Sequence, residues 1–300
     1  MNKIAYITIG PAGCGKSTWA RDIAKRFGST QIIERDIIRQ PYYDSGKTMN
    51  DNIEKEVTDE QTRQILEACS SPLVERIIIS DTNLNPKTRD RLKSIFKEQG
   101  IDIEYVIFDK VLYKDCLSQN DQREGWKRVP LHVMQRMYIQ FREEFPLKHF
   151  VAPEDKDKLP PAYIFDIDGT VAKMHDRSPY DWHLVDEDSP HYDVLHMAQD
   201  LYSLGNEIIF VSGRDGICRA QTEKWLDRWF AKDDPFNRQY KLFMRPVAST
   251  MKDSIVKHDL FHENIAQNYF VKGVFDDRDQ VVDMWRKMGL RTYQVAEGAF

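Results

Sequence analysis

The chain has few cysteines and no long apolar run. Its four cysteines are scattered and form no C-x-x-C pair, which excludes a disulfide framework and makes a zinc site held by sulfur an unfavourable interpretation. Hydrophobic residues make up 41% of the chain and mean hydropathy is -0.60, which excludes a membrane-spanning protein. One lysine and a short apolar stretch lead directly into a glycine motif, unlike a secretory signal. We therefore expect a cytoplasmic protein.

The chain also lacks an excess of basic residues. With 43 basic and 48 acidic residues its formal net charge is -5, which at first sight argues against a nucleic-acid partner. The average hides two unlike halves. Residues 1–150 contain 24 Lys and Arg against 22 Asp and Glu, whereas residues 151–300 contain 19 against 26. All of the excess acidity therefore lies in the second half.

A charged, proline-bounded segment at residues 146–161 marks a domain boundary, and a length of 300 residues favours two domains. We place one domain at 1–150, a linker at 151–161 and a second domain at 162–300. In both domains short β-branched runs alternate with helical patterns, which is typical of parallel sheets. The predicted strands are 4–9, 31–33, 76–79 and 103–108, then 162–165, 207–211 and 272–275. The predicted fold class is α/β, with two parallel-sheet domains.

A glycine-rich motif follows the first predicted strand. Residues 10–18, GPAGCGKST, match G-x-x-x-x-G-K-[ST] between a strand and a helical segment, which is the context that a phosphate-binding P-loop requires. Glycines let backbone N–H groups surround phosphate oxygens, Lys16 reaches the β- and γ-phosphates, and Ser17 is placed to ligate Mg²⁺. The predicted ATP-binding residues are Gly10, Gly13, Gly15, Lys16, Ser17 and Thr18. A glycine turn that only caps a helix explains fewer of these features.

An acid follows the second predicted strand. Asp36 would emerge at the carboxyl edge of the sheet, where such sheets bind ligands, and is our candidate general base for a phosphoryl acceptor. Arg39, three residues later, would share its helical face and is placed to hold an acceptor phosphate with two hydrogen bonds. The alternative is a solvated surface pair.

Two further stretches extend this prediction. Asp81 follows the apolar run 77–79, as an acid that holds Mg²⁺ does in nucleotide-binding folds. An equal alternative is that residues 81–86 cap the next helix. Residues 119–128 form a basic segment that we interpret as a lid over ATP, in which Arg123 stabilises charge on the transferring phosphoryl group. A solvated charged loop remains the alternative.

A second set of acids begins after the strand at 162–165. Asp166 and Asp168 are two positions apart, so both side chains leave an extended chain on the same side. One carboxylate can attack phosphorus to give an aspartyl-phosphate, while the other donates a proton and then activates water. Companion residues follow along the chain: Ser212, Gly213 and Arg214 for phosphate oxygens, Lys257 for charge, and Asp276 and Asp277, with the first two acids, for Mg²⁺. Spacing leaves Lys252 open in place of Lys257.

With these motifs located, the chain resembles the bacteriophage polynucleotide kinase/3′-phosphatase family over essentially its whole length. Its second half also resembles the haloacid dehalogenase superfamily. Segments 17–21, 80–86, 178–181 and 283–286 carry the resemblance beyond a generic P-loop. The resemblance implies a kinase that moves the γ-phosphate of ATP to 5′-hydroxyl ends of RNA or DNA, joined to a Mg²⁺-dependent 3′-phosphatase. It also implies homotetramers, RNA repair and, for a phage-encoded protein, the host cytoplasm.

The resemblance also assigns roles to individual residues. In the kinase they are Lys16 and Ser17 for phosphate, Asp36 as general base, Arg39 for acceptor phosphate and Arg123 as lid arginine. In the phosphatase they are Asp166 as nucleophile, Asp168 as acid/base, Ser212, Arg214, Arg245 and Lys257 for phosphate or substrate, and Asp277 beside Asp276 for metal. The lid departs from the family pattern, with Glu124 and Trp126 around its glycine.

Several alternatives stay open from the sequence. A small-metabolite kinase fused to a small-molecule phosphatase fits the same motifs. A non-catalytic, nucleotide-gated scaffold would lack catalytic groups that are present here. RNA versus DNA preference and the opening of 2′,3′-cyclic phosphates are likewise open.

Overall fold

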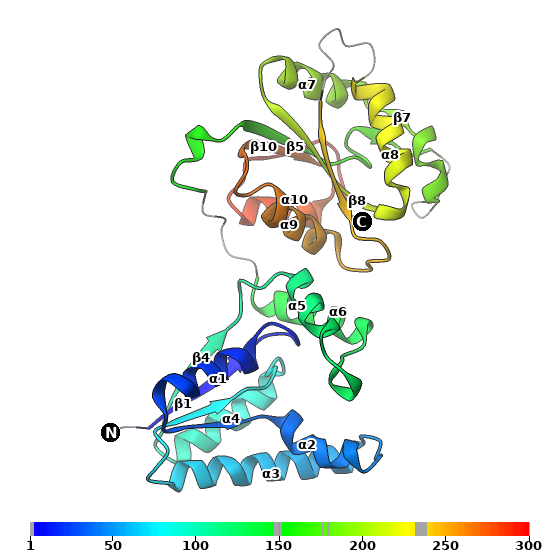
Figure 1. Cartoon of the computed structure of the whole chain (residues 1–300). Helices are drawn as coiled ribbons and strands as arrows, with labels where there is room; N and C mark the ends of the chain where they lie inside the picture. Colours follow the sequence, from blue (N-terminus) through cyan, green and yellow to red (C-terminus); the bar gives the residue numbers. More distant parts are fainter. Residues whose placement is uncertain are drawn as a thin grey trace. The chain divides into compact units, whose positions relative to one another are not determined.

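The structure is a computed structural model, and it describes residues 3–146, 150, 152–175, 177–178, 181–231 and 239–299 (Figure 1). The chain divides into two compact units, Met1–Pro146 and Leu147–Phe300. The division falls at the first proline of the charged segment at 146–161. Among the described residues, no helix combines the length and the apolar character needed to cross a membrane.

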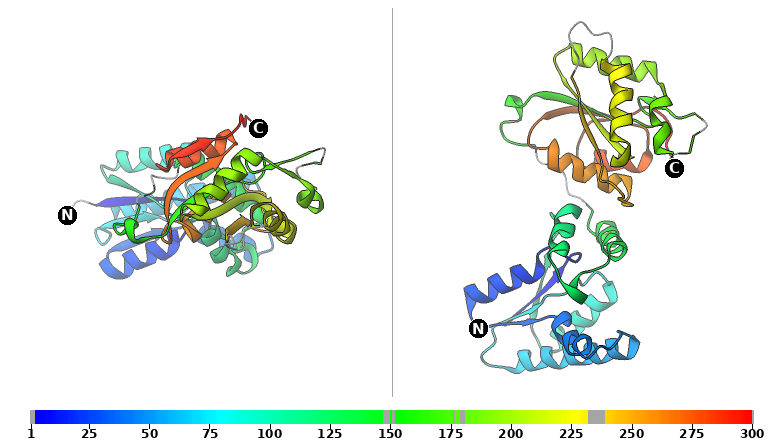
Figure 2. Two further views of the ribbon diagram at one scale, coloured as in Figure 1. Left: turned by 90° about the horizontal axis from the view of Figure 1, so that it is seen from above. Right: turned by 45° about the vertical axis from the view of Figure 1, so that its right-hand side comes forward.

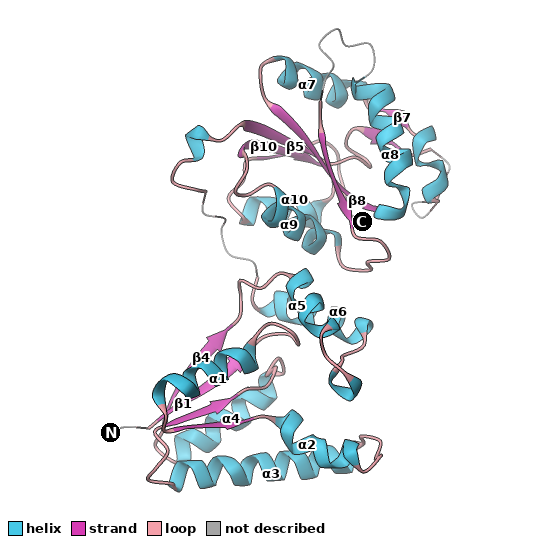
Figure 3. Ribbon diagram, in the orientation of Figure 1, coloured by secondary structure: helices cyan, strands magenta, loops and turns pink. Residues whose placement is uncertain are grey.

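The N-terminal unit is built on a four-stranded parallel sheet in the order β2-β3-β1-β4 (Figure 3). Its strands are β1 (Ile4–Ile9), β2 (Thr30–Ile33), β3 (Arg76–Ile79) and β4 (Asp102–Ile107). Its helices are α1 (Lys16–Phe27), α2 (Arg35–Asp44), α3 (Asp51–Ser70), α4 (Pro86–Glu98), α5 (Tyr113–Asp121), a 3-10 turn η1 (Gly125–Lys127) and α6 (Leu131–Glu144).

Alternation along β1 explains why helices cover both faces of this sheet. Ala5 and Ile7 are fully buried in a cluster with residues of α3 and α4, including Leu92 and Phe96. Successive strand residues point to opposite faces, and Tyr6 between them meets Trp19 of α1 edge to face at 5.8 Å. The strands therefore lie between helical layers, as a parallel sheet requires.

The C-terminal unit is built on a five-stranded parallel sheet in the order β11-β10-β5-β8-β9. Its strands are β5 (Pro161–Phe165), β8 (Glu207–Asp215), β9 (Lys241–Arg245), β10 (Phe270–Asp276) and β11 (Thr292–Gln294), beside a small antiparallel pair, β6 (Ala172–Lys173) and β7 (Ser189–Pro190). Its α-helices are α7 (Tyr192–Ser203), α8 (Arg219–Leu226), α9 (Asp253–Asn264) and α10 (Asp279–Lys287). Shorter helical turns are η2 (Lys156–Lys158), η3 (Trp182–Glu187), η4 (Gly216–Cys218) and η5 (Asp227–Ala231).

Helices again lie on both faces. Figure 1 shows α7 and α8 on one face of this sheet and α9 and α10 on the other, and Figure 2 gives two further views. The α7/α8 side is aromatic: Phe165 and Phe210 of the central strands are fully buried with Trp225 and Phe230. The predicted α/β class with two parallel sheets is confirmed.

Several elements were not predicted, and three of them show why. The longest helix, α3, buries Ile53, Val57, Gln61 and Ile65 along one face, but charged residues between them hide the pattern. The other two are β9 and β11, which are edge strands of three to five residues with few β-branched side chains. Short edge strands carry little sequence signal because packing and pairing hold them in place.

Candidate active sites

The carboxyl ends of β1, β2 and β3 open on one cleft of about 910 Å³ in the N-terminal unit. Nine of the predicted kinase residues line it: Gly13, Gly15, Lys16, Ser17, Thr18, Asp36, Arg39, Asp81 and Arg123. The remaining one, Gly10, directly follows β1 and accepts a hydrogen bond from Lys16 through its carbonyl. The structure thus brings the first predicted set together at one sheet edge.

The P-loop has the backbone that its glycines allow. Gly13 and Gly15 have φ of 77° and 96°, a region that favours glycine, and a Cβ on Gly13 would collide with the carbonyl of Cys116. Lys16 is buried, and its Nζ donates to the carbonyls of Gly10 at 3.0 Å and Pro11 at 2.6 Å. The cation and the start of α1 therefore converge on the loop, where a phosphate is attracted by both.

Asp36 and Arg39 lie together on the first turns of α2. Arg39 Nη1 donates to Asp36 Oδ1 at 3.0 Å, which confirms their predicted shared face. The other donors of Arg39 form a bidentate pair with Glu54 of α3, at 2.8 and 2.9 Å. A phosphate held by two hydrogen bonds from Arg39 would thus have to replace Glu54, which differs from the simple prediction. Burial works to lower the pKa of Arg39, but Glu54 and Asp36 outweigh it and raise that pKa.

Asp81 connects two helices of the same unit. Its Oδ1 accepts from the backbone N–H of Arg35 at 2.8 Å, at the start of α2, and its Oδ2 accepts from Gln61 of α3 at 2.6 Å. The helix that follows, α4, is capped by Asn85 instead. A residue of the stretch 81–86 thus does cap that helix, as the alternative expected, but the cap is Asn85 and not Asp81. Burial raises the pKa of Asp81 to about 6, and its metal role stays a prediction.

The predicted lid is a closed loop between α5 and α6. Buried Asn120 donates to the carbonyl of Val129 at 2.8 Å and accepts from its N–H at 2.9 Å, so the loop 121–128 is fastened at its base. Arg123 in this loop lines the cleft. The loop therefore presents its arginine to the P-loop side, as expected of a lid, through contacts that the sequence does not reveal.

The second cleft, of about 810 Å³, lies at the carboxyl ends of β5, β8 and β10 in the C-terminal unit. The predicted residues that line it are Asp166, Asp168, Gly213, Arg214, Arg245, Lys257 and Asp277. Ser212 and Asp276 lie behind them and are buried. Lys252 lines the same cleft but is exposed. It is the residue immediately before α9.

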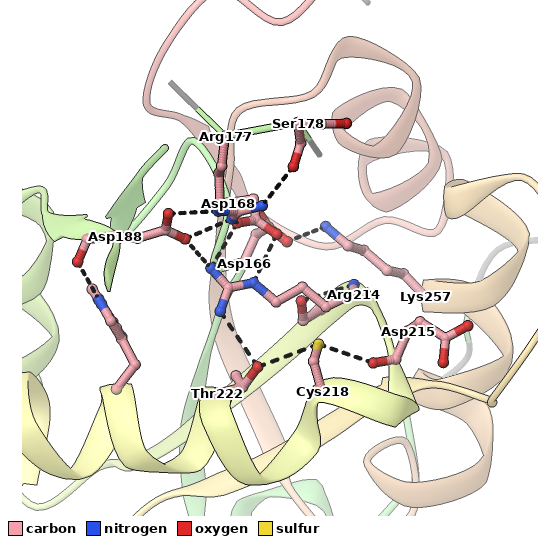
Figure 4. Close-up of polar contacts among 12 residues, drawn as sticks. Asp166, Asp168, Arg177, Ser178, Asp188, Arg214, Asp215, Cys218, Thr222 and Lys257 are labelled. Atoms are coloured by element: carbon pink, nitrogen blue, oxygen red, sulfur yellow. Dashed lines mark hydrogen bonds and ion pairs between the residues drawn. The ribbon is translucent and has the colours of Figure 1, made fainter. Parts of the chain in front are cut away.

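A buried lysine holds the acids of this cleft together. Lys257 Nζ lies 2.5 Å from Asp166 Oδ1 and 2.9 Å from Asp276 Oδ2, and 3.8 Å from Asp253 Oδ2 (Figure 4 shows the first of these contacts). This geometry assigns the open lysine role to Lys257 over Lys252. Burial would lower the pKa of Lys257, but the three acids raise it well above its ordinary value. Lys257 is therefore charged at neutral pH and compensates buried carboxylates.

The acids themselves titrate abnormally. Burial raises the pKa of Asp166 well above its usual value, and Asp276 and Asp277 add to this while Lys257 opposes it. Burial and Asp276 raise the pKa of Asp277 to about 6. A carboxylate with such a pKa gains most from a nearby cation.

Asp166, Asp276 and Asp277 fit a Mg²⁺ site. Each offers a carboxylate oxygen, and these oxygens lie within 4.8 Å of one another. Clustered oxygen ligands with a high negative charge suit a hard divalent cation. Asp168 is not part of this group, so the predicted metal role of its side chain is not supported by its position.

Asp168 lies in a separate network with two arginines (Figure 4). Its oxygens accept from Arg214 at 2.7 and 2.9 Å and from Arg177 at 3.1 Å. Both arginines also bind Asp188, at 2.6 to 2.7 Å. Burial would raise the pKa of Asp168, but Arg214 and Arg177 lower it below its ordinary value.

Two predicted phosphate or substrate contacts are positioned differently from the prediction. The Arg214 side chain is fully buried and bonded to Asp168 and Asp188, so it orients the acid instead of facing the cleft as a free cation. Arg245 donates to the Gly213 carbonyl at 2.7 Å and to Asp253 at 3.2 Å. Both arginines thus shape the walls of the cleft. Ser212 is buried, and its Oγ accepts from the Arg214 N–H.

Sequence reasoning missed several residues that shape the two sites: Glu54, Gln61, Arg177, Asp188 and Asp253. Each acts through contacts with residues of another element or loop, and none lies in a motif of its own. Trp285 was given no role either, although it lies in the segment 283–286 that carries the resemblance. Its indole N–H donates to Asp276 at 3.2 Å, and its side chain is fully buried. For Trp285, the apolar face of α10 was the available signal.

The fold and these two clefts define a two-unit α/β protein with a P-loop site in one unit and a buried Asp–Lys site in the other. Residues 160–300 match the family "Polynucleotide kinase PNKP phosphatase domain", and residues 6–144 match the family "AAA domain". The C-terminal unit is therefore similar to the phosphatase domain of polynucleotide kinase PNKP, and the N-terminal unit is similar to a P-loop domain of the AAA family.

Individual relatives span both units. The chain is 30% identical over 305 aligned positions to a "Putative bifunctional polynucleotide kinase/RNA ligase" of Autographa californica nuclear polyhedrosis virus, covering 97% of this chain and 42% of that protein. It therefore spans about two fifths of that relative's length. It is similar at 27% identity and a TM-score of 0.46 to a chain of the Pnkp1/Rnl/Hen1 RNA repair complex, covering 100% of this chain and 97% of that one. The APS kinase CysC of Mycobacterium tuberculosis matches 40% of this chain and 69% of its own length, at 17% identity and a TM-score of 0.31.

The two lysines of the second cleft give a matched pair of variants. Lys257→Met leaves Asp166 and Asp276 buried without their cation, so we expect the free energy of unfolding at pH 7 to fall by about 3–5 kcal/mol. Lys252→Met, at an exposed position, should change it by about 0.5 kcal/mol or less. Urea denaturation of both variants measures this. Equal losses would contradict the assignment of the buried charge to Lys257.

The raised pKa of Asp277 predicts a pH effect on stability. Its pKa is about 6 in the folded protein and 3.8 in the unfolded chain, so the folded state binds more protons between these values. The free energy of unfolding contributed by Asp277 therefore falls as pH rises from about 4 to 6. In EDTA, Asp277→Asn should reduce that fall by about 1–3 kcal/mol relative to the parent protein. Parallel pH profiles of urea denaturation midpoints for the two proteins would refute this.

Proposed function

We propose that the protein heals broken nucleic-acid ends, phosphorylating 5′-hydroxyls with ATP and removing 3′-phosphates, with Mg²⁺ in both sites. The observation that carries this proposal is the pair of clefts, each with a complete set of groups for phosphoryl transfer. The match of the C-terminal unit to a polynucleotide kinase phosphatase domain supports polynucleotide ends as substrates. The viral relative's name supports RNA among them.

In the kinase cleft, the residues divide into donor and acceptor sides. Lys16 and the P-loop N–H groups bind the phosphates of ATP, and Ser17 lies beside them in the first turn of α1. On the acceptor side, Asp36 takes the proton of the 5′-hydroxyl, while Arg39 binds the phosphate that follows it. Arg123 approaches from the lid loop and stabilises negative charge on the transferring group.

In the phosphatase cleft, Asp166 attacks phosphorus and forms an aspartyl-phosphate as the P–O bond to the 3′-oxygen breaks. Lys257, 2.5 Å away, stabilises the charge of the attacking carboxylate and of the phosphate that it receives. When bound by Asp166, Asp276 and Asp277, Mg²⁺ would neutralise charge on the phosphate and favour the ionised nucleophile.

Asp168 has the second role. Arg214 and Arg177 hold it ionised, which is the form that accepts a proton from water when the aspartyl-phosphate is hydrolysed. Donation of a proton to the leaving 3′-oxygen requires that Asp168 be protonated beforehand. The arginines therefore favour its role as base over its role as acid.

The assembly and the location of the protein belong to the same proposal. Homotetramers and the cytoplasm, or a host cytoplasm for a phage-encoded protein, follow from the resemblance and from the sequence. Sedimentation of the purified protein tests the tetramer directly.

Separate sites predict separable activities. Lys16→Ala should reduce 5′-phosphorylation of an oligonucleotide by at least about 100-fold while the 3′-phosphatase rate stays within about twofold, because only the first cleft loses a phosphate ligand. Asp166→Asn should do the reverse. Both rates are measured on one oligonucleotide with a 5′-hydroxyl and a 3′-phosphate. Loss of both activities in a folded Lys16→Ala variant would contradict two sites, and better turnover of nucleosides or sugars would favour the small-metabolite alternative.

A further inference from the structure

An aromatic pair joins the acceptor side of the kinase cleft to its lid. Tyr43, near the end of α2, and Trp126, in η1 of the lid loop, are stacked with ring centroids 4.3 Å apart and an interplanar angle of 11°. Both side chains are half-buried. Figure 1 shows the two elements that carry them, α2 and the loop that precedes α6. The two flat rings therefore come from different elements and lie nearly parallel.

Tyr43 continues the face of α2 that carries the acceptor groups. Arg39 is three residues after Asp36, and Tyr43 is four residues after Arg39, so all three share one side of the helix. At 1.5 Å per residue, Tyr43 lies about 6 Å further along the helix axis than Arg39. The order along this face is general base, phosphate ligand and aromatic ring.

Trp126 and Tyr43 are carried by elements that separate sets of contacts hold in place. The lid loop is fastened at its base by the two hydrogen bonds between Asn120 and Val129, and Gly125 next to Trp126 has a φ of 57°. The helix α2 is held separately, by Asp81 at its first residue and by Glu54 at Arg39. A small displacement of the loop would therefore separate the two rings without disturbing the contacts of α2.

The surroundings of the pair suit a nucleic-acid chain. Lys127 Nζ lies 5.5 Å from the centroid of the Trp126 ring, and Arg123 is three residues before Trp126 on the same loop. Basic side chains beside aromatic faces are the usual means of holding a single strand without regard to sequence. A nucleobase between the rings needs roughly 3.4 Å of additional separation, the rise of one stacked nucleotide.

We propose that Tyr43 and Trp126 form a stacking clamp for the base of the second nucleotide of the acceptor strand. This inference rests on the proposed kinase function. The 5′-hydroxyl lies at Asp36, the next phosphate at Arg39, and the base beyond that phosphate enters between the two rings. The clamp distinguishes a polynucleotide acceptor from a single nucleotide, because only the former has a second base.

A base-deletion experiment tests the clamp. The probes are fluorescent trinucleotides with a 5′-hydroxyl, either intact or with an abasic sugar at the first or the second position. Their Kd is measured by anisotropy without ATP. The kinase KM is then measured for the same strands. Stacking between a base and an aromatic ring is worth about 5- to 150-fold in affinity. The variants are Trp126→Ala, Trp126→Phe and Tyr43→Ala. Phe27→Ala is the aromatic control, because Phe27 is the last residue of α1, at the end of that helix away from the P-loop.

We expect the losses of affinity from removing the second base and from removing one of the two rings not to add. Removal of the second base should weaken binding to the parent protein about as much as Trp126→Ala or Tyr43→Ala does, and it should cost nothing further in those variants. Trp126→Phe should retain most of the affinity, Phe27→Ala all of it, and the KM for ATP should not change. Three outcomes would overturn the clamp: losses that add, a dependence on the first base, or a rise only in the KM for ATP. Each would indicate that the two rings only hold the lid loop against α2.

The outcomes separate this inference from the function on which it rests. Binding is measured without catalysis, so a parent protein that binds trinucleotides in the expected pattern but phosphorylates none would contradict the kinase proposal alone. A parent protein that phosphorylates trinucleotides and loses nothing in Trp126→Ala would contradict the clamp alone.

Discussion

Both sites depend on one geometric constraint, the common direction of strands in a parallel sheet. Each strand that ends in a polar residue delivers it to the same edge as its neighbours, so residues far apart in sequence meet without long loops. In the first unit this edge gathers the P-loop, Asp36 and Asp81, and in the second it gathers Asp166, Ser212 and Asp276. Helices packed on both faces of each sheet bury the strands that carry these residues.

Charge compensation decides what the gathered acids can do. In the second unit Lys257 neutralises Asp166 and Asp276, while Arg177 and Arg214 neutralise Asp168. Burial raises the pKa of Asp166 against the effect of Lys257, whereas Arg214 and Arg177 outweigh burial and lower the pKa of Asp168. Two acids that are two positions apart therefore have opposite pKa shifts, the usual mark of a nucleophile and a base with different roles. Part of the acidity of the second half is thus internal to the site, so the net charge of -5 does not argue against nucleic-acid ends as substrates.

The sequence predicted the functional residues at the strand ends but not the contacts that form when helices and loops pack against them. The P-loop and the Asp166–Asp168 pair are local patterns, and their positions at strand ends follow from the α/β alternation. Glu54 and Asp188 could not be found, because each meets its arginines only after helix packing or chain reversal. Arg214 was predicted to contact substrate, since the sequence does not show that Asp188 would draw its guanidinium into the interior. Arg123 was predicted to approach the ATP site and does line that cleft, but the ring opposite Trp126 was not predicted.

The central claim is that phosphate passes through Asp166 in a centre separate from the P-loop. The most direct measurement is rapid acid quenching of the protein with an oligonucleotide that carries a ³²P-labelled 3′-phosphate, followed by peptide mapping. We expect the label on the peptide that contains Asp166, in equal amount in Lys16→Ala, and none in Asp166→Asn. Label on another residue, or an amount that falls sharply in Lys16→Ala, would contradict the account.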